Sequence, residues 1–75
     1  MLAYILLQLK ECDEDALLDK LKTFKEVVNA NVLFGEWDLI TQVEITDAEQ
    51  LASFMIEKVR PLPEVKLSST MIVAK

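Results

Sequence analysis

The chain contains no histidine and only one cysteine among its 75 residues. Histidine is the usual general base in catalysis and a common ligand of transition metals, so its absence argues against most acid–base enzymes and metal sites. Cys12 has no second cysteine with which to close an intrachain disulfide, which fits a reducing compartment such as the cytoplasm. We therefore expect a cytoplasmic protein that is not an enzyme and that has no catalytic residue, metal or cofactor.

Glycine occurs once and proline twice, whereas 52% of the residues are hydrophobic and 28% are charged. This composition is typical of dense, regular secondary structure rather than of disorder. A chain of this length makes one domain, residues 1–75, with a thin core. Basic residues are also few, 8 against 13 acidic ones, for a net charge of −5. The chain thus lacks the basic surface that direct binding of nucleic acid requires.

No segment is long and apolar enough to cross a membrane. The apolar run at residues 1–9 is far shorter than the roughly 20 residues that a span needs. It has no charged segment before it and no small-residue cleavage site after it, so we expect neither a signal peptide nor a membrane partner.

Hydrophobic periodicity predicts four strands and two helices. The strands fall at residues 2–9, 27–34, 39–45 and 65–73. The first helix covers residues 13–25 with Asp13 as its N-cap, and the second follows a T-x-x-E capping box at Thr46 and Glu49. The only glycine, Gly35, indicates a hairpin turn with a positive φ between the second and third strands. The buried stripe of the second helix is predicted to be Ala48, Leu51, Ala52, Met55 and Val59, which leaves Phe54 off the stripe as a candidate anchor between subunits.

The predicted order of elements is β-α-β-β-α-β, the ferredoxin-like arrangement of the α+β class. It has a four-stranded antiparallel sheet and two helices on one face. The other face of the sheet has no helix to cover it, yet it carries large apolar side chains, so we expect a homodimer through this face. The expected interface residues are Leu2, Tyr4, Leu6, Gln8, Ile40 and Ile72.

One segment resembles a known family signature. The run Phe34-Gly35-Glu36-Trp37-Asp38-Leu39-Ile40 is similar to the glycine, aromatic, aspartate, apolar pattern between the second and third strands of the Lrp/AsnC effector-binding domain, also called the RAM (regulation of amino-acid metabolism) domain. The resemblance extends over the whole chain through residues 3–9, 28–32, 62–65 and 68–73. Many family members have tyrosine or phenylalanine where this chain has Trp37, which implies a pocket of altered size.

The resemblance implies an amino-acid sensor built from dimers that assemble into octamers or decamers, with an amino-acid effector bound where dimers meet. Full-length members carry a helix-turn-helix domain before this module, and this chain begins at the first strand. It therefore resembles a stand-alone effector-binding domain, which can act on a DNA-binding relative through mixed assembly. The alternative is that the chain is a part of a longer regulator.

The expected ligand-binding residues come from two segments. They are Gly35, Glu36, Trp37 and Asp38 in the hairpin and Ser68 and Thr70 on the last strand. A carboxylate such as that of Asp38 pairs with the ammonium group of an amino acid. The alternative is a hairpin in which Asp38 accepts hydrogen bonds from nearby backbone amides. For Ser68 and Thr70 the alternative is a polar patch at a dimer seam, and Tyr4 and Gln8 could line the pocket rather than the interface.

Two other functions remain open. The chain could be a structural adaptor that joins full-length regulators without any effector. It could also be a small dimeric monooxygenase of the same fold, with Asn29, Asn31 and Trp37 in its site, although the absence of histidine weakens this hypothesis. Cys12, which is flanked by acidic residues, is expected to have a raised thiol pKa and low reactivity.

Overall fold

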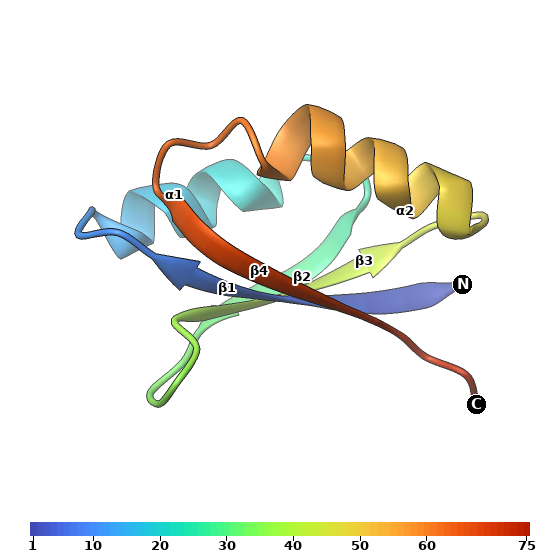
Figure 1. Ribbon diagram of the computed structural model, residues 1–75, viewed down its shortest axis with the longest axis horizontal. Coiled ribbons are helices and arrows are strands. Elements are labelled where there is room, and N and C mark those ends of the chain that lie inside the picture. Colours follow the sequence, from blue (N-terminus) through green and yellow to red (C-terminus); the bar gives the residue numbers. More distant parts are fainter.

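A single antiparallel sheet forms the floor of the molecule, and two helices lie across one side of it (Figure 1). The computed structural model describes residues 1–75. Its elements are β1 (Leu2–Leu9), α1 (Glu14–Lys22), β2 (Val27–Val32), β3 (Leu39–Glu44), α2 (Ala48–Phe54), the π-helical turn η1 (Met55–Val59) and β4 (Val65–Ile72). The order β-α-β-β-α-β confirms the predicted ferredoxin-like fold.

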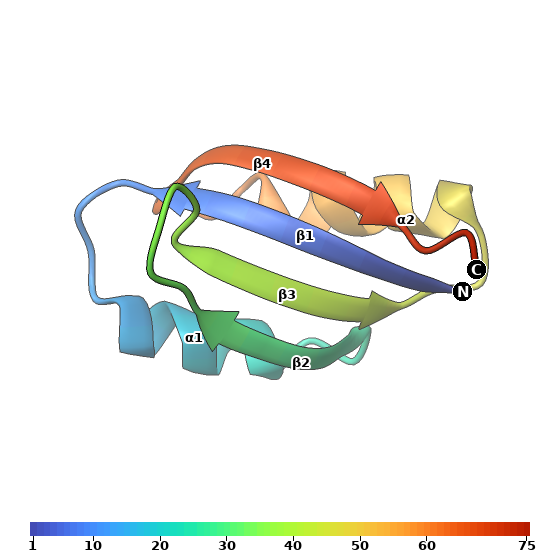
Figure 2. The ribbon, with the colours of Figure 1, turned by 90° about the horizontal axis from the view of Figure 1, so that it is seen from below.

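The strands lie in the order β2-β3-β1-β4, with every neighbouring pair antiparallel. Figure 2 shows this sheet from the side without helices, with the N- and C-termini close together at one end. The β2–β3 hairpin lies at the opposite end, and in Figure 1 it projects away from the helices. β2 and β4 are the edge strands.

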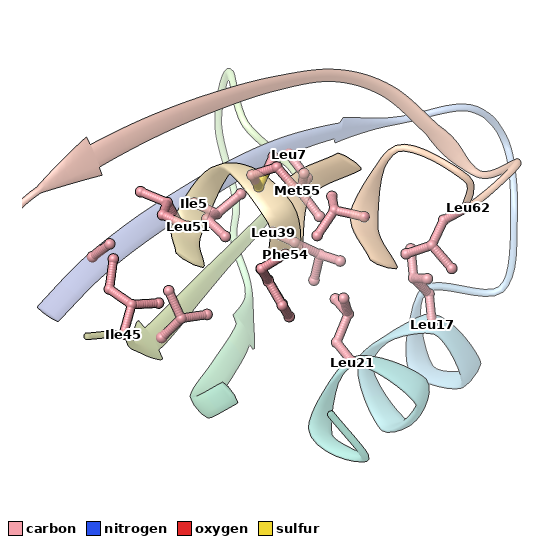
Figure 3. Close-up of a cluster of buried hydrophobic side chains, with 13 residues drawn as sticks. Ile5, Leu7, Leu17, Leu21, Leu39, Ile45, Leu51, Phe54, Met55 and Leu62 are labelled. Atoms are coloured by element: carbon pink, nitrogen blue, oxygen red, sulfur yellow. The ribbon is translucent and has the colours of Figure 1, made fainter. Parts of the chain in front are cut away.

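The core lies between the sheet and the two helices (Figure 3). Ala3, Ile5 and Leu7 of β1 point into it and have no exposed surface. Leu17 and Leu21 of α1 cover the β2–β3 side of the sheet, and Leu51 of α2 is also buried. Alternation along β1 thus puts every second side chain in the core and leaves the others on the uncovered face.

Local sequence sets both ends of α1. Asp13 accepts a hydrogen bond from the backbone N–H of Ala16 at 3.1 Å, which confirms it as the N-cap. The helix ends at Lys22, three residues before the predicted end at position 25. The Thr23 hydroxyl donates to the Lys20 carbonyl at 2.6 Å and the Phe24 amide donates to the Leu21 carbonyl, so the chain turns toward β2 at this point.

The predicted capping box of α2 was wrong by one residue. Asp47, not Thr46, is the N-cap, and its carboxylate accepts from the Gln50 amide at 2.8 Å. The side-chain oxygen of Gln50 accepts in return from the Thr46 backbone amide. Gln50 thus donates its amide to the N-cap Asp47 and accepts from the residue before it, Thr46, and Glu49 makes neither bond.

The predicted stripe of α2 was also partly wrong. Phe54 is only 2% exposed, whereas Ala48 and Ala52 are on the solvent side. The ring of Phe54 meets that of Phe24 edge-on, with centroids 6.0 Å apart and planes at 84°. The buried stripe is rotated toward Phe54 because this ring fills the space between the two helices, so Phe54 is a core residue and not an anchor between subunits.

The face of the sheet opposite the helices is the open face. Its side chains include Leu2, Tyr4 and Leu6 of β1 and Ile40 of β3, as predicted. The prediction that Ile72 lies on the open face was wrong. Ile72 pairs with the buried Ala3 and so faces the helix side, whereas Met71 pairs with Tyr4 and lies on the open face. Both faces of β4 carry apolar residues, so its alternation alone did not determine which set points inward.

Candidate functional site

Three hydrogen bonds fasten the base of the β2–β3 hairpin to the end of β1. The Gln8 side-chain amide donates to the Glu36 carbonyl at 3.0 Å. The Leu9 backbone N–H donates to Oδ2 of Asp38 at 2.7 Å, and the Asp38 N–H donates to the Leu7 carbonyl at 2.9 Å. Gln8, predicted at the dimer interface, therefore also holds the hairpin in place.

Asp38, the residue just before β3, extends the hydrogen bonding between β3 and β1 by one more position. Because β3 begins at Leu39, the N–H of Leu9 has no backbone carbonyl opposite it, and the carboxylate of Asp38 supplies the acceptor. The predicted alternative, a bond within the hairpin, is thus replaced by a bond to an amide 29 residues away. Oδ1 of Asp38 makes no hydrogen bond within the chain and remains available.

The tip of the hairpin has no such attachment. Gly35 has a φ of +146°, as its uniqueness in the sequence predicted, and nothing lies within 4 Å of where a Cβ would sit. Phe34 is fully exposed, at 109% of its reference surface. Sequence reasoning missed this ring because the alternating pattern assigned residue 34 to a strand, but β2 ends at Val32.

A hollow of about 470 Å³ lies beside this hairpin. We call it the hairpin hollow; it is lined by Glu14, Val32, Leu33, Phe34, Gly35 and Asp38. Two of the predicted ligand-binding residues, Gly35 and Asp38, therefore share one hollow. Glu36 and Trp37 line no hollow within the chain.

A smaller hollow of about 230 Å³ adjoins it through Glu14 and Asp38 and includes Cys12. Burial raises the pKa of the Cys12 thiol, and the carboxylate of Glu64 raises it further. The predicted direction of the pKa shift is confirmed, and burial is its largest single cause. A thiol with a raised pKa is a weak nucleophile at neutral pH.

Ser68 and Thr70 do not meet the hairpin within one chain. Ser68 pairs with Leu7 and Thr70 with Ile5, and both partners point into the core. The two hydroxyl groups therefore face the helix side of β4, and neither lies on the open face. The hairpin projects to the other side of the sheet (Figure 1).

Thr70 instead lines a groove between β4 and the second helix. This helix–strand groove measures about 240 Å³. Its lining is mostly apolar and consists of Ala48, Leu51, Ala52, Met55, Ile56, Arg60 and Thr70. The exposed Ala48 and Ala52 belong to it, so the small side chains that we had placed in the core form the floor of a surface groove.

An ion pair braces the helix layer behind these sites. Both side-chain oxygens of Glu26 accept from Nζ of Lys58, at 2.8 and 3.0 Å. Nζ also lies 5.6 Å from the ring centroid of Phe24 and 5.8 Å from that of Phe54. The hydrogen bond from Lys58 holds the pKa of Glu26 below its usual value, although burial opposes this shift. Sequence reasoning missed this pair because its members are 32 residues apart.

The residues suggested for a monooxygenase are divided between β2 and the hairpin. Asn29 and Asn31 pair with Gln42 and Ile40 and lie exposed on β2, while Trp37 is half-buried in the hairpin. No group of three or more His, Cys, Asp or Glu side chains is arranged to hold a metal ion. No helix has both the length and the apolar character that a membrane span requires.

Comparison with known proteins gives one consistent result. The sequence model of the Lrp/AsnC ligand binding domain matches residues 2–75. The HTH-type transcriptional regulator FL11 of Pyrococcus horikoshii is 28% identical over 75 residues, which cover 100% of this chain and 49% of the regulator. The chain thus spans about half the length of the curated relatives that it matches, and these are transcriptional regulators.

Solved structures agree with this match. The hypothetical protein PHS023 from Pyrococcus horikoshii is 39% identical, with a TM-score of 0.90 over 96% of this chain and 87% of that protein. The transcriptional regulator NMB0573 from Neisseria meningitidis, solved as a complex with L-Met, has a TM-score of 0.89 over 99% of this chain and 49% of its own. It is only 20% identical, so it shows a shared fold.

Proposed function

The chain belongs to the family of Lrp/AsnC ligand binding domains, and from this premise we propose that it senses a small amino acid and changes its assembly in response. The free oxygen of Asp38 beside the open backbone at Gly35 is the observation that supports ligand binding most directly. A carboxylate held in place by a backbone amide is ready to pair with an ammonium group. The L-Met complex of the Neisseria regulator, which shares this fold, points to the same class of ligand.

The open face supports the assembly part of the proposal. It carries Leu2, Tyr4, Leu6, Ile40 and Met71, and both helices lie on the other side of the sheet (Figure 1). An apolar sheet face left in water is costly, and a second copy packed against it would bury it. A stable pair of this kind covers about 800 Å² on each partner. We propose a homodimer through this face, with dimers joined into an octamer or decamer.

The ligand site is completed by a second copy of the chain. Asp38 and Gly35 lie in the hairpin, whereas Ser68 and Thr70 lie on the helix side of β4, so the four residues do not converge within one subunit. Contact between dimers brings the hairpin of one copy to the β4 strand of another. Ligand binding then changes the affinity between dimers, which is the coupling that a sensor needs.

Titration calorimetry of the protein with each of the twenty amino acids tests ligand binding. Asp38→Asn keeps an oxygen that can accept from Leu9 but removes the charge, so we expect the fold to persist and affinity for the amino acid to fall by about tenfold or more. Glu57→Gln is the matched control, because it removes a carboxylate from the exposed side of η1. No heat at millimolar ligand from an intact oligomer would contradict the sensing role.

A second candidate function is that of a structural adaptor, which would assemble with longer relatives without binding a ligand. FL11 contains a segment similar to this chain over about half of its length, and a shared open face would allow mixed dimers. Co-expression with a longer relative, followed by size-exclusion chromatography, separates the two functions. Mixed particles whose formation is insensitive to every amino acid favour the adaptor.

A further inference from the structure

Two features of the surface remain without a partner in the chain. One is the ring of Phe34, fully exposed at the tip of the hairpin. The other is the helix–strand groove, an apolar hollow of about 240 Å³ on the helix side. An exposed aromatic ring gives up apolar contact that burial would recover, and aromatic residues are frequent anchors in protein interfaces.

The ring and the groove match in size and in polarity. An apolar cavity of about 150 Å³ holds a benzene ring, so the groove has room for one aromatic side chain. Its floor is formed by small or apolar residues such as Ala48, Ala52 and Met55. Open space surrounds Gly35, next to Phe34, with no atom of the chain within 4 Å of where a Cβ would sit, so nothing within the subunit covers this part of the tip.

The charges around the two features are also complementary. Glu36 is exposed two residues after Phe34, and Arg60, the only arginine in the chain, lines the groove. A docked tip would therefore place a carboxylate near a guanidinium group, a pairing with specific geometry. Docking within one chain is excluded, because the hairpin projects from the open side of the sheet and the groove lies on the helix side (Figures 1 and 2).

We propose that Phe34 of one copy inserts into the helix–strand groove of another copy and that Glu36 pairs with Arg60 there. This contact uses a different surface on each partner, so it can link one copy to the next, and it forms a closed ring when the rotation between copies closes. Each dimer formed through the open face offers two tips and two grooves. The same contact brings Gly35 and Asp38 of one copy toward Thr70 of the next, so this inference rests on the proposed site and names the anchor that completes it.

Light scattering on size-separated protein tests the inference. Wild-type protein is expected to form particles larger than a dimer, and Phe34→Ser is expected to weaken them by about tenfold or more while leaving dimers. Phe34→Leu, the matched control, keeps an apolar side chain at the tip and should retain more of the large particles. Large particles that persist unchanged in Phe34→Ser would overturn the inference.

Charge exchange gives an independent readout. Glu36→Lys alone and Arg60→Glu alone should each reduce the large particles, and the double variant Glu36→Lys/Arg60→Glu should restore them. Failure of the double variant to recover would overturn the Glu36–Arg60 pairing. Monomers in every variant, wild type included, would instead overturn the proposed dimer, so the two failures are distinguishable.

Discussion

Lys58 joins two segments that are far apart in the sequence, the turn before β2 and the end of the second helix. Its ammonium group donates to Glu26, which is 9% exposed, and lies over the rings of Phe24 and Phe54. From the sequence alone, Lys58 and Glu26 are expected to be ordinary surface charges. Nothing in the local pattern shows that the turn before β2 packs against η1. This is the residue-scale feature that sequence reasoning had no means to find.

Removal of the Lys58 charge should destabilise the fold. In Lys58→Met the methylene stem remains, but the Glu26 carboxylate loses its partner, and we expect the free energy of unfolding in urea to fall by about 1–3 kcal/mol at pH 7. The double variant Glu26→Gln/Lys58→Met should lose less than the sum of the single variants. A change below about 0.5 kcal/mol in Lys58→Met would contradict a role beyond that of a surface charge.

The pH dependence follows from the same pair. Because Lys58 lowers the pKa of Glu26 in the folded state, the unfolded chain binds that proton more tightly. The stabilisation is therefore present above the usual glutamate pKa of about 4.3 and is lost as the pH falls below it toward the folded value. Lys58→Met should remove this part of the acid dependence, which urea unfolding at a series of pH values measures.

At the scale of elements, the sequence predicted the turn of the β2–β3 hairpin correctly but not the way in which the hairpin is attached to β1. The only glycine gave the correct turn and the correct sign of φ. The attachment of Asp38 to Leu9 was not predictable, because it depends on where β3 begins relative to β1. Other errors share this cause: Ile72 was assigned to the wrong face because the register between β1 and β4 was unknown.

Gly35→Ala tests the hairpin directly. Since nothing lies within 4 Å of the added Cβ, the cost comes only from the φ of +146°, and we expect a loss of about 1–3 kcal/mol in the free energy of unfolding or a displaced tip. Glu36→Ala, at the next position, has no such constraint and serves as the control for stability alone. Equal free energies of unfolding in the two variants would argue against a strained backbone at Gly35.

At the scale of the whole molecule, the fold and its uncovered face followed from the sequence, since the helices need one apolar side of the sheet and β1 is apolar on both of its sides. The separation of the predicted site residues did not follow, because it depends on the register of β4: Gly35 and Asp38 share the hairpin hollow, whereas Ser68 and Thr70 face the helix side. One face of the sheet packs against the helices to form the core, and the other carries apolar residues that no helix covers.

The mass of the particle in solution tests this central claim most directly. Sedimentation equilibrium at micromolar concentration should give a dimer or a multiple of it for the wild type. Leu6→Asp, which puts a charge on the open face next to Ile40, should give folded monomers, while Ser53→Asp, on the exposed side of α2, should leave the mass unchanged. A wild-type protein that sediments as a folded single subunit would contradict the account.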